Sequence, residues 1–350
     1  MNLSAEDFSG ARPVGSMHGN DYRDHQLRQF RRFVVKALVT VAVAWYLFTK
    51  VPLADVRKSL DGASPTWIAL GFAIQILIRI VNAWRIRLIA AAQGAPLSFG
   101  AILSVLFTSA LYGLLLPGSI GGGAATLVKY VGKGATASAA LASMVVNRLL
   151  ETITVLSFAA FFWGLAQLEA GATGSAYWAI ALVVAAPLLL IVSYVLLFGR
   201  ARLLARVERW RPFWERWRVT RGLGAVLQQC ARAGSLRAMP AASVCSLSMF
   251  KELLAALSAY CFARSLGIEL PLVAVAWMQS AVGLLVLLPI TISGLGVRES
   301  ALVLATRAYG VEPATALSWG LVQFASLLGI VLIGGLIEAR AWWLSPARLT

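Results

Sequence analysis

Eight long apolar runs dominate the sequence and limit the folds that it can adopt. They lie near residues 33–49, 66–89, 99–117, 136–166, 176–198, 239–263, 271–290 and 314–337. Most are about 16–25 residues long, which is the length that an α-helix needs to cross a hydrocarbon core of about 30 Å. Hydrophobic residues make up 59% of the chain and charged residues only 13%, a balance outside the range of soluble domains. We therefore expect an all-α fold, a polytopic transmembrane helical bundle.

The formal net charge of +16 indicates contact with lipid and not with nucleic acid. The basic stretches flank apolar runs, where Lys and Arg meet anionic lipid headgroups at the cytoplasmic face of a membrane. The 3 cysteines have no metal-site or disulfide spacing, and both histidines, His18 and His25, precede the first apolar run. We therefore expect no metal, no cofactor and no histidine-based catalysis inside the membrane.

The positions of Lys and Arg predict how the helices are oriented. Residues 199–238 carry ten arginines, and short loops this basic stay in the cytoplasm. The tail 1–32, which we expect to be disordered, and the tail 341–350 should also be cytoplasmic, with a single transmembrane domain, 33–340, between them. Segments 99–132 and 271–310 must then turn back as re-entrant hairpins that enter from opposite sides. The alternative, eight full crossings with the N-terminus outside, leaves more Lys and Arg outside.

The tips of the two predicted hairpins resemble each other. The first reads LLPGSIGGG over residues 115–123, and the second reads LLPITISGLG over residues 287–296. A following apolar run starts with Ala-Thr-Ala in both copies, at 135–137 and at 314–316. Because the copies enter from opposite sides, the pattern predicts an inverted repeat. The tip residues are Pro117, Ser119, Gly121 and Gly122 in the first copy, and Pro289, Thr291, Gly294 and Gly296 in the second.

Paired breaks of this kind indicate the binding site of a transporter. Proline and glycine free backbone N–H and C=O groups, which are costly in lipid unless protein or a wet cavity covers them. The helix that resumes after each tip also presents its positive N-terminal end, where a phosphate can bind. The alternative is that Pro117 and Pro289 only kink ordinary helices and that the glycines serve close packing.

Ionisable residues at membrane depth supply further candidates, since charges in lipid are costly, usually paired and usually mark a site. Arg148 and Glu151 are three apart on one predicted helix and can pair, either in a site or as a structural ion pair. Lys251 and Glu252 are neighbours that point about 100° apart on a helix, so we expect each to have a different partner. Arg79 shares a face with polar neighbours and can instead snorkel to the interface.

The predicted roles fall into two groups. The candidate headgroup-binding residues are Arg148, Lys251, Arg298, Ser119 and Thr291. The candidate charge-balancing or proton-carrying residues are Glu151, Glu252 and Glu299.

Three stretches resemble the transmembrane region of lysylphosphatidylglycerol synthases, also known as the flippase-like family. They are LYGLLLPGSIGGGAATLVKY (111–130), VVNRLLETITVL (145–156) and LLPITISGLGVRESALVL (287–304). The resemblance covers most of residues 35–340. It implies a bacterial or archaeal inner-membrane protein that translocates lipids between leaflets, for example aminoacylated phosphatidylglycerol, and relatives are linked to hopanoid or glycolipid pathways. It places Arg298 and Glu299 in the family's GxGxRE element and Arg148 at a common membrane arginine.

Two departures from the family's pattern affect what the resemblance implies. Many members have an acidic residue and then an arginine after the first glycine cluster. Here Gly123, Ala124, Ala125 and Thr126 follow, and Lys129 is the nearest charge. The 350 residues contain no soluble aminoacyl-transfer domain, so we expect that this chain does not make a lysyl-lipid itself.

We therefore expect a transporter of the bacterial inner membrane that moves an anionic or modified phospholipid, or a related lipid, between leaflets. An alternative is a lipid-binding accessory protein that moves nothing and works with an enzyme of a lipid, glycolipid or hopanoid biosynthetic pathway. A third alternative is an intramembrane enzyme. The apolar runs contain no His or Asp and no recognisable catalytic spacing, so we expect no enzymatic activity.

Overall fold

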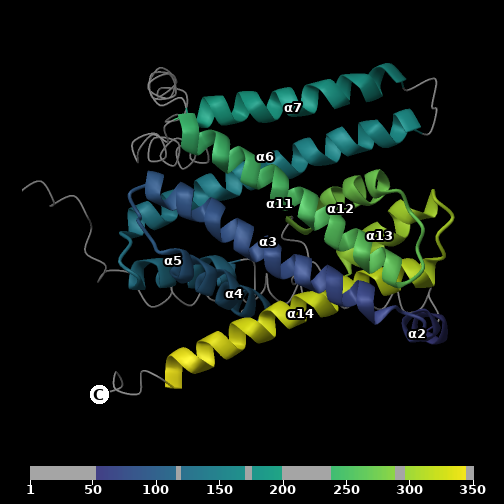
Figure 1. Cartoon of the computed structure of the whole chain (residues 1–350), viewed down its shortest axis with the longest axis horizontal. Coiled ribbons are helices and arrows are strands. Elements are labelled where there is room, and N and C mark those ends of the chain that lie inside the picture. The colour runs from purple at the N-terminus through teal and green to yellow at the C-terminus, as the bar shows by residue number, and fades with distance from the viewer. Residues whose placement is uncertain (1–52, 116–119, 170–175, 199–237, 288–295, 344–350) are drawn as a thin grey trace, which may run out of the picture.

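The structure, a computed structural model, describes residues 53–115, 120–169, 176–198, 238–287 and 296–343. Helices account for almost all of these residues (Figure 1), which confirms the predicted all-α fold. The helices are α2 (Leu53–Asp61), α3 (Pro65–Ala92), α4 (Phe99–Leu115), α5 (Ile120–Gly132), α6 (Ala137–Glu169), α7 (Ala176–Phe198), α11 (Ala238–Ser265), α12 (Leu272–Leu287), α13 (Val297–Arg307) and α14 (Pro313–Trp343). The first apolar run, 33–49, and most of the arginine-rich segment lie outside the described residues.

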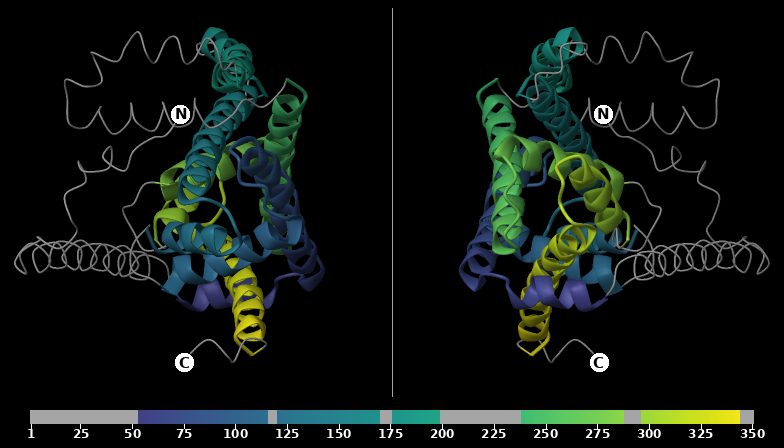
Figure 2. Two further views of the ribbon diagram at one scale, coloured as in Figure 1. Left: turned by 90° about the vertical axis from the view of Figure 1, so that its left-hand side faces the viewer. Right: turned by 90° about the vertical axis from the view of Figure 1, so that its right-hand side faces the viewer.

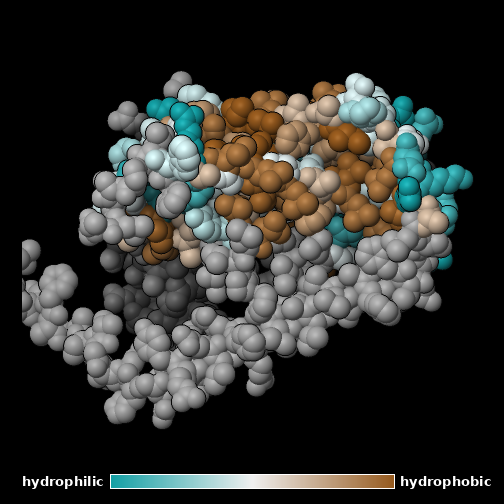
Figure 3. Space-filling view, turned by 90° about the horizontal axis from the view of Figure 1, so that it is seen from below, coloured by the Kyte–Doolittle hydropathy of each residue, from teal (hydrophilic) through white to brown (hydrophobic). Residues whose placement is uncertain are grey.

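The bundle presents an apolar surface to its surroundings. Among the described helices, α3, α6, α11 and α14 are long and apolar enough to cross a membrane. Large apolar side chains on their outer faces are exposed, for example Leu141 on α6, Leu253 on α11 and Leu332 on α14. On the face shown in Figure 3, an apolar belt is bounded by hydrophilic residues at both ends of the long axis. Since soluble proteins rarely expose such a patch, the chain is a multi-pass helical membrane protein.

An antiparallel pair of helices, α3 and α11, runs through the bundle (Figure 1). The backbone N–H of Ser64, just before α3, donates to the carbonyl of Ser265, the last residue of α11, at 2.8 Å. Farther along the pair, the Ser258 hydroxyl donates to the carbonyl of Gly71 at 3.0 Å. Gly71 permits this close approach, because a Cβ there would lie 2.5 Å from the ring of the buried Phe262.

Two shorter helix pairs enter the bundle from opposite ends. The outer ends of α4 and α5 lie where α3 ends, at Ala92, and those of α12 and α13 lie where α6 ends, at Glu169 (Figure 1). These ends are referred to below as the Ala92 end and the Glu169 end. Seen along the long axis, α7 and α14 lie at opposite edges of the bundle (Figure 2). The helix pairs predicted within 99–132 and 271–310 are therefore present, while the predicted tips at 116–119 and 288–295 lie outside the described residues.

The first turn of each half has the same backbone geometry. Gly94 follows α3 with a φ of 77°, and Gly267 follows α11 with a φ of 72°. Glycine adopts this left-handed backbone without steric cost and commonly ends a helix. The hydrogen bonds match as well, with Ala95 N–H donating to Ala90 and Ile268 N–H donating to Ala263.

The second turn is also repeated, and it corrects the predicted alignment of the two copies. Gly134 before α6 has a φ of 97°, and Gly310 before α14, 176 residues later, has a φ of 71°. The carbonyl of Thr136 accepts the N–H of Ala140, as that of Glu312 accepts the N–H of Ala316. Thr136 therefore corresponds to Glu312. The predicted match between the two Ala-Thr-Ala stretches is wrong by about one helical turn, because the residues of the two stretches lie at different distances from these equivalent turns.

Each helix pair packs against the long helix of the other half. α4 lies against α14, where Gly334 leaves room for the backbone of Phe107. α12 lies against α6, where Gly283 faces Val155. The two halves are therefore interlocked, as expected for an inverted repeat whose hairpins meet inside the bundle.

Candidate functional site

Five charged side chains from α3, α6 and α11 gather near the middle of the bundle. Lys251, near the middle of α11, has its Nζ 2.6 Å from Glu252 Oε1 and 3.0 Å from Glu151 Oε1 of α6. Arg79 and Arg85 of α3 both interact electrostatically with Glu151. These five residues are referred to below as the central cluster.

Arg85 connects three helices by hydrogen bonds. Its side chain is fully buried, with 0% exposed. The guanidinium donates to Ser248 Oγ of α11 at 3.2 Å and to Asn147 Oδ1 of α6 at 2.6 Å. Its Nε is buried and has no hydrogen-bond partner. A buried guanidinium has five N–H donors to satisfy, so Arg85 keeps donor capacity for a further acceptor.

Arg79 lies one to two turns before Arg85 on α3. Arg79, Asn82 and Arg85 recur every three residues, so they lie toward one side of the helix. Arg79 Nε and Asn82 Oδ1 are both buried without a hydrogen-bond partner. Since the Arg79 Nε lies inside the bundle, the structure favours a role in the site over snorkelling to the interface.

The central cluster contains more positive than negative groups. Two arginines and one lysine face two glutamates across α3, α6 and α11. An uncompensated charge is costly in a low-dielectric interior. The arrangement can therefore hold one further anionic group near the middle of the bundle.

Glu151 forms its ion pair with Lys251 of the neighbouring helix, whereas Arg148, the predicted partner of Glu151, is exposed on α6 and interacts with Glu151 electrostatically. The expectation of separate partners for Lys251 and Glu252 is wrong, since the Lys251 ammonium contacts both glutamates. The ammonium has three donors on a flexible stem, so it can satisfy a neighbour in sequence and a carboxylate of another helix together.

Glu299 caps its own helix, a role that the sequence did not predict beside the balancing of the site's cations. Its Oε2 accepts the N–H of Gly296 at 2.7 Å, and its Oε1 is buried without a partner. Its side chain lies against α14, where a Cβ on Gly320 would be 2.9 Å from Glu299 Cγ. A carboxylate thus already complements the positive N-terminal end of α13. Arg298 is partly buried and interacts electrostatically with Glu299.

The described tip residues are glycines that allow tight packing or an unusual backbone. Gly122 lies against α4, where a Cβ would be 3.2 Å from the carbonyl oxygen of Ser109. Gly121 lies in the first turn of α5, and Gly296 has a φ of 81°. The other predicted tip residues, Pro117, Ser119, Pro289, Thr291 and Gly294, lie outside the described residues.

The sequence prediction missed Arg85 and Asn147. Arg85 lies near the end of the apolar run 66–89, and it continues the spacing of Arg79 and Asn82. That spacing is a signal that could have identified it. Asn147 is a single amide in an apolar run, and only the position of α3 beside α6 reveals its role.

A further polar contact, also missed, lies at the Ala92 end. Lys129 Nζ of α5 is 2.6 Å from Glu338 Oε2 of α14. The Tyr112 hydroxyl of α4 donates to Glu338 Oε1 at 3.0 Å. These bonds join both helices of the first hairpin to the last helix of the chain.

Comparison with known proteins shows the family of this chain. A family model described as the lysylphosphatidylglycerol synthase TM region matches residues 33–335, which include the whole central cluster and all of the repeat except the end of α14. The chain is also 33% identical over 97 residues to a UPF0104 membrane protein of Methanothermobacter thermautotrophicus. That alignment covers 27% of this chain and 28% of the relative.

Proposed function

Because the chain belongs to the family of the lysylphosphatidylglycerol synthase transmembrane region, we propose that it is a flippase-like lipid transporter. It moves an anionic or modified phospholipid between the leaflets of the bacterial inner membrane. The central cluster holds the headgroup midway, while the acyl chains remain in the surrounding hydrocarbon.

The main support for this proposal is the surplus of buried positive charge in the central cluster. A phosphate would supply the negative charge that the central cluster lacks. Its oxygens can accept hydrogen bonds from the unpartnered Nε atoms of Arg79 and Arg85, and arginine suits phosphate because its planar fork matches two oxygens. Charges inside a membrane usually mark a substrate pathway.

The repeat supports movement of the bound lipid. Halves of opposite orientation can rock against each other and expose a central site to each side in turn. The central cluster takes residues from α3 and α6 in the first half and from α11 in the second. It therefore lies at the junction that such rocking would reshape.

The Ala92 end faces the cytoplasm in this proposal, together with both chain termini. α7 ends and α11 begins at this end (Figure 1). Residues 199–238, which include the connection between these helices, carry ten arginines, and basic segments of this length stay cytoplasmic.

Reconstitution into liposomes with a fluorescent phosphatidylglycerol tests the proposal. Arg79→Gln is expected to slow translocation by about 10- to 100-fold, the effect of losing one charged hydrogen bond of about 1.5–3 kcal/mol. Arg87→Gln is the matched control, because Arg87 is exposed on the same helix and stacks over Trp84 at 5.3 Å. It should translocate at the wild-type rate.

The outcome also separates the two lipid-related functions. Translocation by Arg79→Gln at the wild-type rate would show that the central cluster does not take part in translocation. Stoichiometric lipid binding without any translocation by the wild-type protein would instead favour an accessory protein of lipid biosynthesis. A co-purifying enzyme would then be the partner to identify.

A further inference from the structure

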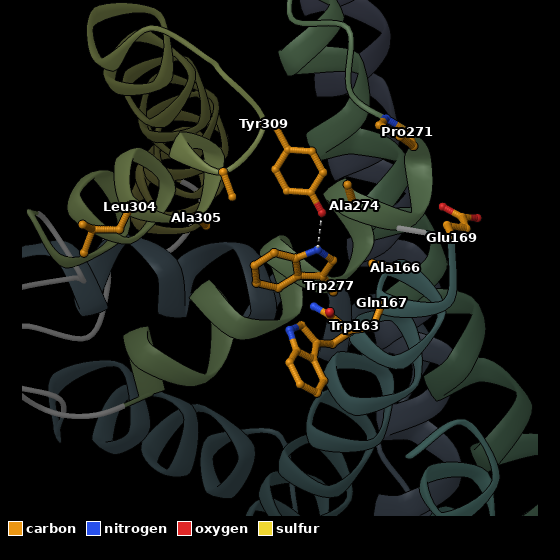
Figure 4. Close-up of a pocket in the computed structure, with 11 residues that line it drawn as sticks. Trp163, Ala166, Gln167, Glu169, Pro271, Ala274, Trp277, Leu304, Ala305 and Tyr309 are labelled. Atoms are coloured by element: carbon orange, nitrogen blue, oxygen red, sulfur yellow. Dashed lines mark hydrogen bonds between the residues drawn. The ribbon is translucent and has the colours of Figure 1, made fainter. Parts of the chain in front are cut away.

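A pocket of about 590 Å³ opens at the Glu169 end between α6, α12 and α13. Its aromatic walls are Trp163 of α6, Trp277 of α12 and Tyr309, which follows α13. Figure 4 shows Trp277 between Tyr309 and Trp163, with Trp277 Nε1 donating to the Tyr309 hydroxyl at 3.3 Å. Trp and Tyr are the side chains that favour the headgroup level of a membrane, since each has an apolar ring and a polar atom.

Two buried polar atoms lie deeper along the helices that form the pocket. Ser157 lies on α6 between Glu151 and Trp163, and Gln279 lies on α12 on the hairpin-tip side of Trp277. Ser157 Oγ and Gln279 Oε1 have no hydrogen-bond partner. Such atoms are costly inside an apolar bundle unless water or a ligand reaches them. Both atoms lie farther from the Glu169 end than Trp163 and Trp277 do.

At the equivalent position in the other half of the repeat, an ion pair joins α5 and α14. Lys129 of α5 corresponds to Ala305 of α13, 176 residues later, and Glu338 of α14 corresponds to Phe162 of α6, 176 residues earlier. Ala305 lines the pocket, and neither Ala305 nor Phe162 can form an ion pair. At the Ala92 end, in contrast, the ion pair at 2.6 Å holds α5 against α14.

We propose that the pocket is the port through which a phospholipid headgroup moves between the Glu169 end and the central cluster. The Lys129–Glu338 ion pair is the gate that closes the equivalent port at the Ala92 end. The structure is then the state open at the Glu169 end. This inference rests on the proposed function. Because the ion pair exists in only one of the two states, breaking it favours the state in which the pocket is closed.

Thiol labelling tests the gate without measuring transport. Ala308 lines the pocket and is exposed, so Ala308→Cys, with the 3 native cysteines replaced by serine, should react with a water-soluble maleimide. Adding Glu338→Gln is expected to slow the labelling by about fivefold, a population shift within reach of one partly exposed ion pair. The exchange of Lys129→Glu with Glu338→Lys should restore the rate.

The control for labelling is Glu269→Gln. It breaks the ion pair of Arg264 and Glu269, whose atoms lie 3.4 Å apart on the surface at the Glu169 end. Its labelling rate should match that of Ala308→Cys alone. An unchanged rate in the Glu338→Gln chain would show that Lys129 and Glu338 are not the gate.

Blocking the pocket tests the port. Ala308→Trp should fill it and slow liposome translocation by about tenfold, whereas Ala91→Trp, exposed at the opposite end, should leave the rate unchanged. A wild-type rate in Ala308→Trp would overturn the port while leaving the proposed transport intact. No translocation by the wild-type protein would overturn the proposed function, whereas the labelling experiment would still decide the gate.

Discussion

Lys251 forms ion pairs with two carboxylates, so the central cluster is sensitive to the loss of either one. Glu151 and Glu252 approach its ammonium at 3.0 and 2.6 Å, while Arg79 and Arg85 of α3 lie near Glu151. Removing a carboxylate leaves a second uncompensated positive charge in a buried site. Breaking a buried ion pair in this way is more damaging than removing both partners together.

Glu151→Gln is therefore expected to lower the free energy of unfolding by about 2 kcal/mol. The loss is below the usual range for a fully buried pair, because the Glu151 side chain is 27% exposed and water screens part of the interaction. Adding Lys251→Gln should recover part of the loss, since it restores the original charge balance. Thermal unfolding in detergent measures both, and a double variant less stable than Glu151→Gln would contradict this account.

At the scale of single elements, the turns at Gly134 and Gly310 are one structure built twice. Both have a φ in the left-handed region, and a Cβ on either glycine would meet nothing within 4 Å. The cost of a side chain there comes from the backbone alone. The two halves of the repeat should therefore respond alike to the same substitution.

Gly134→Ala and Gly310→Ala are each expected to lower the free energy of unfolding by about 1–2 kcal/mol, the cost of a left-handed alanine. Gly132→Ala is the control, because a Cβ there also meets nothing within 4 Å and its φ is not left-handed. Thermal unfolding of the three variants measures the difference. A marked loss at one turn and none at the other would contradict the equivalence of the two halves.

At the scale of the whole molecule, the hairpin arrangement determines which residues face the same side of the membrane. Ser98 precedes α4 and Lys133 follows α5, and both are exposed at the Ala92 end. In the alternative with eight full crossings, the segment between them would cross once, so these residues would face opposite sides. Glu312, just before α14, belongs to the Glu169 end in the structure.

Cysteine labelling from each side of inverted and right-side-out vesicles distinguishes these arrangements. Ser98→Cys and Lys133→Cys should react from the cytoplasmic side, and Glu312→Cys should react only from the other side, because basic segments stay cytoplasmic. Reaction of Ser98→Cys and Lys133→Cys from opposite sides would exclude the first hairpin. Reaction of all three from the reversed sides would keep the hairpin and invert the proposed orientation.

The sequence by itself determined that this is a helical membrane protein and where its two shorter helix pairs lie. Helix length, apolar content and the proline and glycine breaks are local properties of the chain, so they can be read one segment at a time. Opposite entry of the hairpins followed from the arginines of residues 199–238, which restrict the topology without any tertiary contact.

Only the tertiary structure decided which charges meet. Glu151 pairs with Lys251 because α6 packs against α11. Arg85 is buried because α3 lies against both α11, which carries Ser248, and α6, which carries Asn147. An apolar helix can turn any side toward its neighbours in lipid, since hydropathy is similar all around it. The sequence therefore identifies the charges at membrane depth, whereas the packing of the two halves selects their partners.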